Sequence, residues 1–239
     1  MIQFITRLLL LGLLFAGSGC VTAPDQPVAD PLEGMNRVLF MFNDGLDSVV
    51  LAPVARGYKW ISPRFLERGI RNFFANLYDI NGAVNAGLQG RFPEMAQNSG
   101  RFVVNSTVGM FGFVDVATEM GIDPYRTDFG HTLSIWGVRS GPYVMVPFFG
   151  PRTVRSAVGT AFDTVVSLQW QLDTKTRDRL FAMEIIDNRA SLVGAEGLIT
   201  GDRYIFVRDA YLQQREYFIN GGVVEDTFSN FEDEFEWDE

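Results

Sequence analysis

RFLERGIRNFFANLYDI, residues 64–80, is the most strongly periodic stretch of this 239-residue chain. Its apolar side chains recur every three or four residues, which places them on one face of an α-helix: Phe65, Leu66, Ile70, Phe73, Phe74 and Leu77. Arg64, Arg68 and Arg71 fall among the polar positions. The stretch predicts an amphipathic helix, whose apolar face packs on a protein core or lies at the headgroup boundary of a membrane.

Other segments of the chain also favour helices. Residues 177–193 and 203–219 repeat the same spacing of apolar side chains. Between residues 109 and 155 glycine and proline recur, which favours short helices and loops. The apolar run YVMVPFF at 143–149 contains Pro147, and proline argues against a central strand. The predicted fold class is therefore mostly α, with amphipathic or interfacial helices and glycine-rich loops.

The segment that begins at residue 32 predicts a helical hairpin. Residues 32–42 are suited to a helix, Asn43, Asp44 and Gly45 form a strong turn signal, and residues 49–55 are apolar again. Each arm is too short to cross a bilayer, and no later stretch offers the roughly 18 continuous apolar residues of a spanning helix. We therefore expect no membrane-spanning helix, and the hairpin either packs into a core or lies in a membrane interface.

The N-terminus predicts an exported lipoprotein. Arg7 precedes the apolar run at 8–16, and the small residues at 17–19 lead directly into Cys20, the one cysteine of the chain. This pattern indicates a signal peptide rather than a spanning helix, and it resembles a lipobox with Cys20 as the lipidated residue. Gly17 departs from the usual lipobox, and the alternative is an ordinary signal peptide with an incidental cysteine.

Composition divides the chain into four parts. We expect a signal peptide at 1–19, a lipidated tether at 20–31, a helical domain at 32–222, and an acidic, disordered tail at 223–239. An alternative for the tail is an arm that docks on a basic partner.

The charge pattern argues against nucleic acid as a partner. The formal net charge of −9 is concentrated in residues 225–239, which hold acids and no bases, and the rest of the chain has no concentrated basic patch. All bases but Lys59 and Lys175 are arginines, which suits phosphate binding or reflects a codon preference.

The sequence offers no recognisable catalytic apparatus. His131 is the single histidine, no G-x-S-x-G elbow follows the signal peptide, and Cys20 is unavailable as a nucleophile once lipidated. Metal sites built on His and Cys clusters cannot be assembled from these residues. We expect no enzyme activity, no catalytic residue, no metal and no cofactor, although catalysis by carboxylates alone stays open.

Four strings in order resemble the MlaA (VacJ) family of outer-membrane phospholipid-transport lipoproteins, and the similarity covers roughly residues 30–222. The strings are DPLEGMNRVLFMFND at 30–44, NSTVGMFGFVDVA at 105–117, DFGHTLSIWGVRSGPYVMVPFFGPRTVR at 128–155 and YIFVRDAYLQQREYFINGG at 204–222.

The resemblance implies a mostly α-helical, ring-like protein in the inner leaflet of the bacterial outer membrane, lipid-anchored on the periplasmic side, with an amphipathic channel. It implies removal of mislocalised glycerophospholipids from the outer leaflet, with a trimeric porin as partner and the periplasmic carrier MlaC as acceptor. It also implies that a hairpin controlling the channel corresponds to Met41, Phe42, Asn43 and Asp44.

Within the channel that the resemblance implies, we expect segments 141–155 and 38–55 to contribute wall. Arg152 and Arg155 are candidates for lipid headgroup contacts, and the alternative is that they pair with local acids. Two other functions remain open: a structural lipoprotein that organises porins or the envelope without transporting lipid, and a lipid hydrolase.

Overall fold

The structure is a computed structural model that describes residues 30–194, 197 and 199–221. The predicted signal peptide, Cys20, most of the tether and the acidic tail lie outside the described residues. The chain divides into two units, Met1–Pro31 and Leu32–Glu239, and the following description concerns the second.

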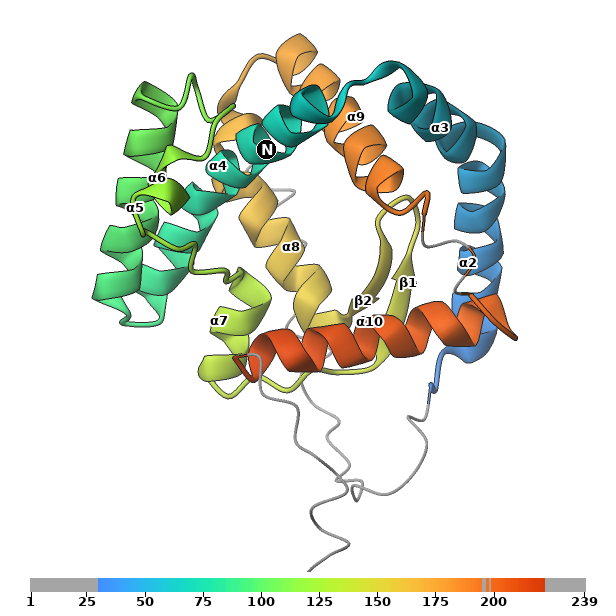
Figure 1. Cartoon of the computed structure of the whole chain (residues 1–239). Coiled ribbons are helices and arrows are strands. Elements are labelled where there is room, and N and C mark those ends of the chain that lie inside the picture. The colour runs from blue at the N-terminus through green and yellow to red at the C-terminus, as the bar shows by residue number, and fades with distance from the viewer. Residues whose placement is uncertain (1–29, 195–196, 198, 222–239) are drawn as a thin grey trace, which may run out of the picture. The chain divides into compact units, whose positions relative to one another are not determined.

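This unit is mostly helical, which confirms the predicted fold class (Figure 1). Its helices are α2 (Glu33–Leu46), η1 (Asp47–Leu51), α3 (Ala52–Ile61), α4 (Arg64–Leu88), α5 (Phe92–Thr107), α6 (Val116–Glu119), α7 (Phe129–Ile135), α8 (Val154–Val166), η2 (Leu168–Gln171), α9 (Thr174–Ser191) and α10 (Arg203–Ile219). Two strands, β1 (Tyr143–Val146) and β2 (Gly150–Thr153), complete it.

The three strongly periodic segments all form helices. The stretch at 64–80 begins α4, which starts after the extended Pro63 and continues to Leu88. The segments at 177–193 and 203–219 correspond to α9 and α10. The predicted helical hairpin at 32–55 is wrong, because α2 continues through the π-helical turn η1 into α3 without a reversal of the chain.

The turn signal at Asn43, Asp44 and Gly45 is overridden by tertiary contacts. The Asn43 amide binds the backbone of residues 146 and 148, and Asp44 forms an ion pair with Arg203 at 3.0 Å. Each side chain therefore has a distant partner and does not need the local backbone bonds that favour a turn.

The helix Glu33–Ile61 is, by length and apolar composition, long enough to cross a membrane. The short length of each predicted arm is therefore not a reason to exclude a membrane-spanning helix at these residues. One face of the helix is nevertheless held to the rest of the protein by ion pairs, from Arg37 to Asp202 at 2.8 Å and from Asp47 to Arg189 at 2.6 Å. These charged contacts favour a helix that lies along the protein over one surrounded by lipid.

Residues 143–153 form a β-hairpin rather than the loop that Pro147 suggested. β1 and β2 pair antiparallel, with Tyr143 opposite Thr153 and Val146 opposite Gly150. Pro147 lies in the turn, where it interrupts no ladder hydrogen bond. Phe148 and Gly150 take positive φ angles of 66° and 76°, which close the turn.

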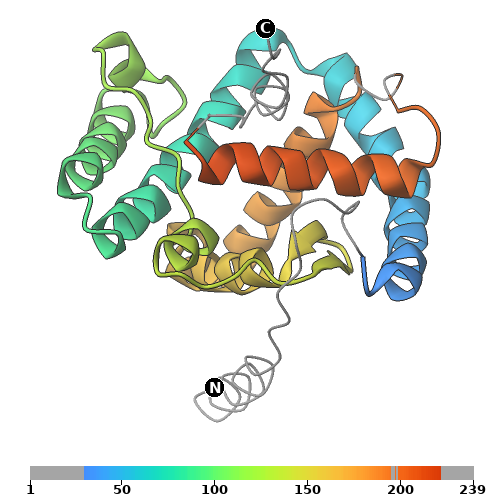
Figure 2. The same cartoon turned by 90° about the horizontal axis from the view of Figure 1, so that it is seen from below.

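The elements contact one another in a closed circuit, the ring-like arrangement expected for this unit (Figure 1). From α2 and η1 the contacts pass through α3, α9, α4, α7, α8, β2 and β1, and β1 returns to α2. α5 and α6 extend from α4 outside this circuit, and α10 contacts β2 as it runs across one face (Figure 2).

Candidate functional site

Large apolar side chains are exposed over much of this unit. Trp60 is 87% exposed, Phe111 81% and Val49 75%. The buried apolar cluster, by contrast, is small: Tyr143, Met145 and Tyr204. Many of the buried residues are polar, and Asn36, Asn85 and Asn98 are among the largest fully buried side chains. This reverses the usual pattern of a water-soluble protein and indicates a surface that faces an apolar medium.

The polar face of α2 binds the free edge of the β-hairpin. Asn36 donates from Nδ2 to the carbonyl oxygen of Tyr143 at 3.0 Å and accepts from the amide of Met145 at 2.8 Å. Seven residues later, Asn43 donates to the carbonyl oxygen of Val146 at 3.0 Å and accepts from the amide of Phe148 at 2.9 Å. The two amides satisfy backbone groups that an edge strand otherwise leaves unpaired.

The structure brings three of the four predicted hairpin residues to well-defined contacts. The ring of Phe42 meets that of Phe148 edge-on, with centroids 5.3 Å apart, next to the Asn43 bonds. Asp44 pairs with Arg203 at the start of α10, and Met41 is exposed. These residues thus do not form a hairpin themselves. Instead, Phe42 and Asn43 bind the β1–β2 hairpin to α2.

The hairpin turn also reaches the opposite side of the circuit. Phe149 lies 6.2 Å, centroid to centroid, from Phe181 on α9. Adjacent aromatic residues of one turn therefore contact α2 and α9. Phe148 and Phe149 both stay about half exposed or more, so that few contacts besides these hold the tip of the turn.

Arg152 and Arg155 have different neighbours. Arg152 is half-buried on β2, where Nη1 donates to the carbonyl oxygen of Pro151 at 2.7 Å. Arg155, at the start of α8, donates from Nη1 to the carbonyl oxygen of Val138 at 2.7 Å, and its Nε is buried without a hydrogen bond. Neither forms an ion pair with a carboxylate in the part of the chain that the structure describes.

Arg152 acts electrostatically on a pair of groups from α4 and α9. The hydroxyl of Tyr78 donates to the carboxylate of Glu184. Burial and then Glu184 raise the pKa of Tyr78, while Arg152 opposes that rise. Burial also raises the pKa of Glu184. Burial lowers the pKa of Arg155, and the neighbouring Arg215 lowers it further.

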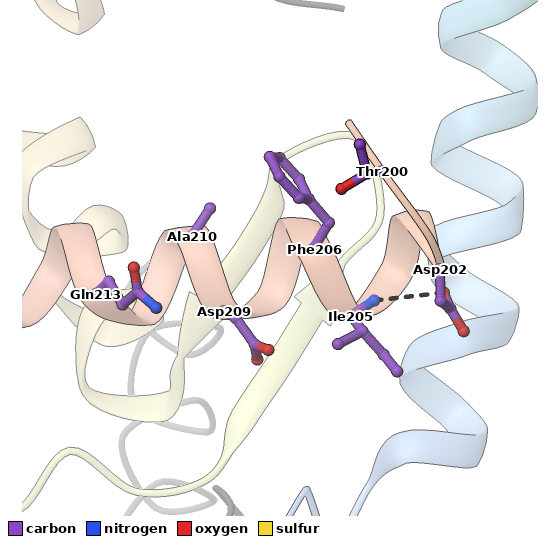
Figure 3. A pocket seen from close by; sticks show the side chains of 7 residues that line it. All are labelled: Thr200, Asp202, Ile205, Phe206, Asp209, Ala210 and Gln213. Atoms are coloured by element: carbon purple, nitrogen blue, oxygen red, sulfur yellow. Dashed lines mark hydrogen bonds between the residues drawn. The ribbon is translucent and has the colours of Figure 1, made fainter. Parts of the chain in front are cut away.

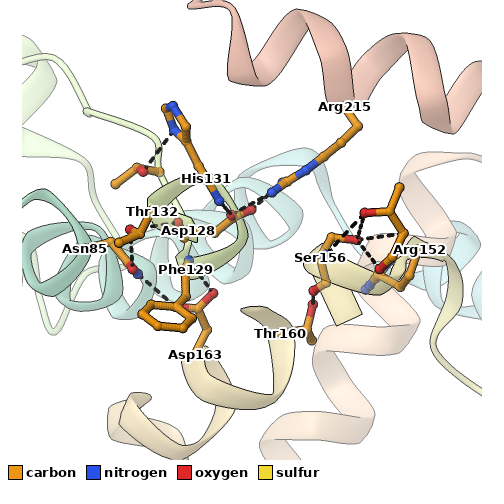
Figure 4. A network of polar contacts seen from close by, with 12 residues as sticks. Asn85, Asp128, Phe129, His131, Thr132, Arg152, Ser156, Thr160, Asp163 and Arg215 are labelled. Carbon is orange, nitrogen blue, oxygen red and sulfur yellow. Dashed lines mark hydrogen bonds and ion pairs between the residues drawn. The ribbon is translucent and has the colours of Figure 1, made fainter. Parts of the chain in front are cut away.

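A partly buried polar network joins α4, α7, α8 and α10, and sequence reasoning missed it (Figure 4). Asp128 caps α7 and binds Arg215 at 2.8 Å. Asp163 accepts from the amide of Phe129 at 3.0 Å and from Asn85 at 2.8 Å. The Asp128-Phe129-Gly130 string therefore has a structural role. No local signal pairs residues so distant in the chain.

The surroundings of the single histidine fit the same structural role. His131 is buried, its Nδ1 lies 3.2 Å from Oγ1 of Thr127, and its ring faces Phe218. Burial lowers the pKa of His131, which keeps the ring neutral near pH 7. Within the described ranges, no group of three or more His, Cys, Asp or Glu residues could hold a metal ion.

A cavity of about 450 Å³ opens along α10 (Figure 3). Seven residues line it: Thr200, Asp202, Ile205, Phe206, Asp209, Ala210 and Gln213. Its two carboxylates are already paired, Asp202 with Arg37 and Asp209 with Arg208. The lining can contact an apolar chain but provides no free acid or base for catalysis.

Comparisons with known proteins give this arrangement a family. The intermembrane phospholipid transport system lipoprotein MlaA of Escherichia coli K12 is 36% identical over 212 residues, which cover 85% of this chain and 84% of that protein. The protein of the same name from Haemophilus influenzae is 28% identical over 244 residues, covering 96% and 97%.

A solved chain from work on the structural basis for maintenance of bacterial outer membrane lipid asymmetry superposes with a TM-score of 0.71 at 36% identity. It covers 80% of this chain and 100% of its own. A sequence model of the MlaA lipoprotein family matches residues 28–218. The chain therefore belongs to the MlaA lipoprotein family.

Proposed function

We propose that this protein is a lipoprotein of the bacterial outer membrane that carries phospholipids out of the outer leaflet, without enzymatic chemistry, and so maintains lipid asymmetry. The observation that carries the proposal is the reversed distribution of side chains: apolar groups are exposed and polar groups are buried. The relatives named for intermembrane phospholipid transport support it.

The physical task is to move a charged headgroup past acyl chains. An unpaired charge in an apolar medium costs on the order of several kcal/mol even after relaxation. Polar side chains on an otherwise apolar wall lower that barrier, and no bond is made or broken. We infer that the β1–β2 hairpin and the segment 38–55 contribute this wall, and that their contacts through Phe42 and Asn43 control access to it.

For the headgroup we propose Arg152 and Arg155. Both guanidinium groups are bound only to backbone carbonyls in the described part of the chain, so that each keeps donors for a phosphate. Arg152 has the stronger support, because Tyr78 and Glu184 nearby add a hydroxyl and a carboxylate. The set could bind the phosphate and the amine of a zwitterionic lipid.

The lipid on Cys20, a trimeric porin and the carrier MlaC complete the proposal. We infer that the covalent lipid and a porin hold the protein in the membrane, and that the carrier accepts the lipid. The described chain contains no recognised nucleotide-binding motif, so direction would come from the affinity of the acceptor or from energy supplied elsewhere.

One experiment tests the function against its alternatives. In a strain that lacks the gene, phospholipid should accumulate at the cell surface, and deletion of the carrier gene should give the same defect. A structural lipoprotein predicts porin mislocalisation without that dependence. A hydrolase predicts lyso-lipid products from the purified protein.

The headgroup assignment has its own test. Complementation with Arg152→Glu combined with Arg155→Glu should leave surface phospholipid high at normal protein abundance. Arg68→Glu, which reverses an exposed charge on α4, is the matched control and should restore asymmetry. Normal asymmetry in the double variant would refute the assignment.

A further inference from the structure

A second cavity, of about 260 Å³, lies where the chain turns from α3 into α4 and both meet α9. Its lining is mostly polar, unlike that of the cavity along α10. Its lining comes from all three helices: Tyr58, Lys59, Glu67, Arg71, Asp187, Ala190 and Ser191. Contacts among these residues join α3 and α4 to α9.

The charged groups of this cavity are incompletely paired. Asp187 is 3% exposed and accepts a hydrogen bond from the Tyr58 hydroxyl at 3.1 Å, while Nε of Arg71 lies 3.9 Å from its other oxygen. Among the residues that the structure describes, Nζ of Lys59 reaches only the carbonyl oxygen of Ala190, at 3.5 Å. Two cations thus keep donors directed to no strong acceptor.

The carboxylates of Glu67 and Asp187 balance the positive charges of this cavity. The side chain of Glu67 makes no hydrogen bond or ion pair in the described part of the chain. Burial, and then Asp187, raises the pKa of Tyr58 to about 12, which keeps this phenol neutral and its proton on the bond to Asp187. Two positive and two negative groups therefore surround one cavity, with a neutral phenol between them.

Exposed apolar side chains adjoin the cavity in the sequence. Trp60 and Ile61 follow Lys59, and Phe65 precedes Glu67 by two residues; all three are strongly exposed. Aromatic and aliphatic groups next to cations are typical of segments at the headgroup level of a bilayer, where the rings enter the acyl region and the cations meet phosphates.

We propose that this cavity binds the phosphoethanolamine headgroup of a phospholipid in the surrounding leaflet. The phosphate contacts Lys59 and Arg71, and the ammonium group contacts Glu67. A zwitterion fits better than an anion, because an anionic group would leave Glu67 unpaired and repelled. The site rests on the membrane location of the protein and not on transport: it holds a resident lipid that fixes how the α3–α4 corner lies in the interface.

The test is a calorimetric titration, in which dihexanoyl phosphatidylethanolamine is added to the full-length lipoprotein in detergent micelles. The double variant Lys59→Ala with Arg71→Ala should bind at least about tenfold more weakly, because it loses two charge-assisted contacts. Arg68→Ala, an exposed cation of α4 outside the cavity, is the matched control and should bind like the wild type. Equal binding by the double variant and the wild type would overturn the site.

Two further arms identify the ligand. Glu67→Gln should weaken phosphatidylethanolamine binding but not dihexanoyl phosphatidylglycerol binding, which isolates the ammonium contact. Glycerophosphoethanolamine, without acyl chains, should bind more weakly than the lipid, and inorganic phosphate more weakly still. Inorganic phosphate binding as tightly as the lipid would overturn the lipid assignment.

A last comparison separates this site from the proposed transport function. The double variant should still lower surface phospholipid in a strain lacking the gene, because its substitutions lie away from the hairpin. Loss of headgroup binding with retained transport supports a resident-lipid site. If the double variant still binds the headgroup but no longer transports lipid, the headgroup site is refuted. The proposal that the wild-type protein transports phospholipid would still stand.

Discussion

At the scale of single residues, two asparagines determine how α2 meets the β1–β2 hairpin. Asn36 and Asn43 are seven residues apart, so they lie on the same face of α2, two turns from each other. Each side chain presents one donor and one acceptor to the backbone of the hairpin. The helix thereby substitutes for a third strand.

Asn43→Ala should loosen the hairpin turn while leaving the rest of the protein folded. The substitution removes two hydrogen bonds, worth about 1–3 kcal/mol together. Hydrogen exchange of the amides of Val146, Phe148, Phe149 and Gly150 should become faster by one to two orders of magnitude. Asn188→Ala, an exposed asparagine on α9, is the control and should change nothing. Unchanged exchange in Asn43→Ala would show that the aromatic contacts alone hold the turn.

A second residue-scale feature is the buried guanidinium of Arg101. It lies 3.2 Å from Asp79 on α4 and 3.1 Å from Asp115, which precedes α6. Burial outweighs the attraction of Arg101 and raises the pKa of Asp79 to about 6. Hydrogen bonds from Thr118, Asn105 and Arg101 overcome burial and lower the pKa of Asp115.

Asp79 gives stability a predictable pH dependence. The folded protein binds a proton here more readily than the unfolded chain, so this group stabilises the fold as the pH falls through about 6 toward 4. Asp79→Asn removes that contribution, which is on the order of 2 kcal/mol. The difference in melting temperature, wild type minus variant, should be larger at pH 5 than at pH 7.5. An equal difference at both pH values would contradict the prediction.

At the scale of elements, α7 and α8 approach each other closely. Gly159 and Gly130 face each other there, and a Cβ atom added to Gly159 would lie 2.7 Å from Cα of Gly130. The contact involves backbone on both sides, so that no side chain can move aside. It positions Asp163 of α8 to accept from the amide of Phe129.

Gly159→Ala should therefore destabilise the protein by about 1–3 kcal/mol or more, since α7 and α8 must separate. Gly100→Ala is a matched control, because that glycine lies inside α5 with nothing within 4 Å of an added Cβ. It should be neutral or stabilise by up to about 1 kcal/mol. Chemical denaturation in detergent measures both. A milder effect at Gly159 than at Gly100 would contradict the close approach.

The sequence predicted α4 well, because one face of this helix carries its apolar side chains. α9 and α10 form where helices were predicted, although their apolar side chains are not concentrated on one face. The break at Asn43–Gly45 and the loop at 143–149 were wrong for one shared reason. The two segments bind each other across more than a hundred residues, and their local signals do not include the partner.

The candidate site was predictable only in part. Met41 to Asp44 and Arg152 were singled out, but their contacts were not, because ring packing and amide bonds depend on the fold. The pairing of Asp163 with Asn85 and the cavity at Lys59 and Arg71 unite side chains from separate helices. No spacing rule in the sequence connects them.

At the scale of the whole molecule, exposed apolar surface should hold the protein on membranes even without its lipid. We consider a Cys20→Ala chain with a conventional cleavable signal peptide, so that no uncleaved signal acts as an anchor. A substantial share should still sediment with membranes, because α2, η1 and α3 expose an apolar stripe. Cell fractionation measures this, and complete recovery in the soluble fraction would contradict it.

A charge within that stripe gives the matching test. Val49→Glu in the Cys20→Ala chain should shift protein from membranes to the soluble fraction, because Val49 is strongly exposed on η1. Gln214→Glu, an exposed polar position on α10, adds the same charge elsewhere and should not. An equal shift by both would indicate a general effect of charge.

The ion pairs between α2 and α10 have a consequence for how the chain is made. Arg37 pairs with Asp202, which follows it by 165 residues, and Asp44 pairs with Arg203, which follows it by 159 residues. Because synthesis runs from the N-terminus, α2 is made long before α10 is available to pair with it. The docking of α10 on α2 is thus a late event of biogenesis, and a chain truncated before residue 202 would leave Arg37 and Asp44 of its first helix permanently without those partners.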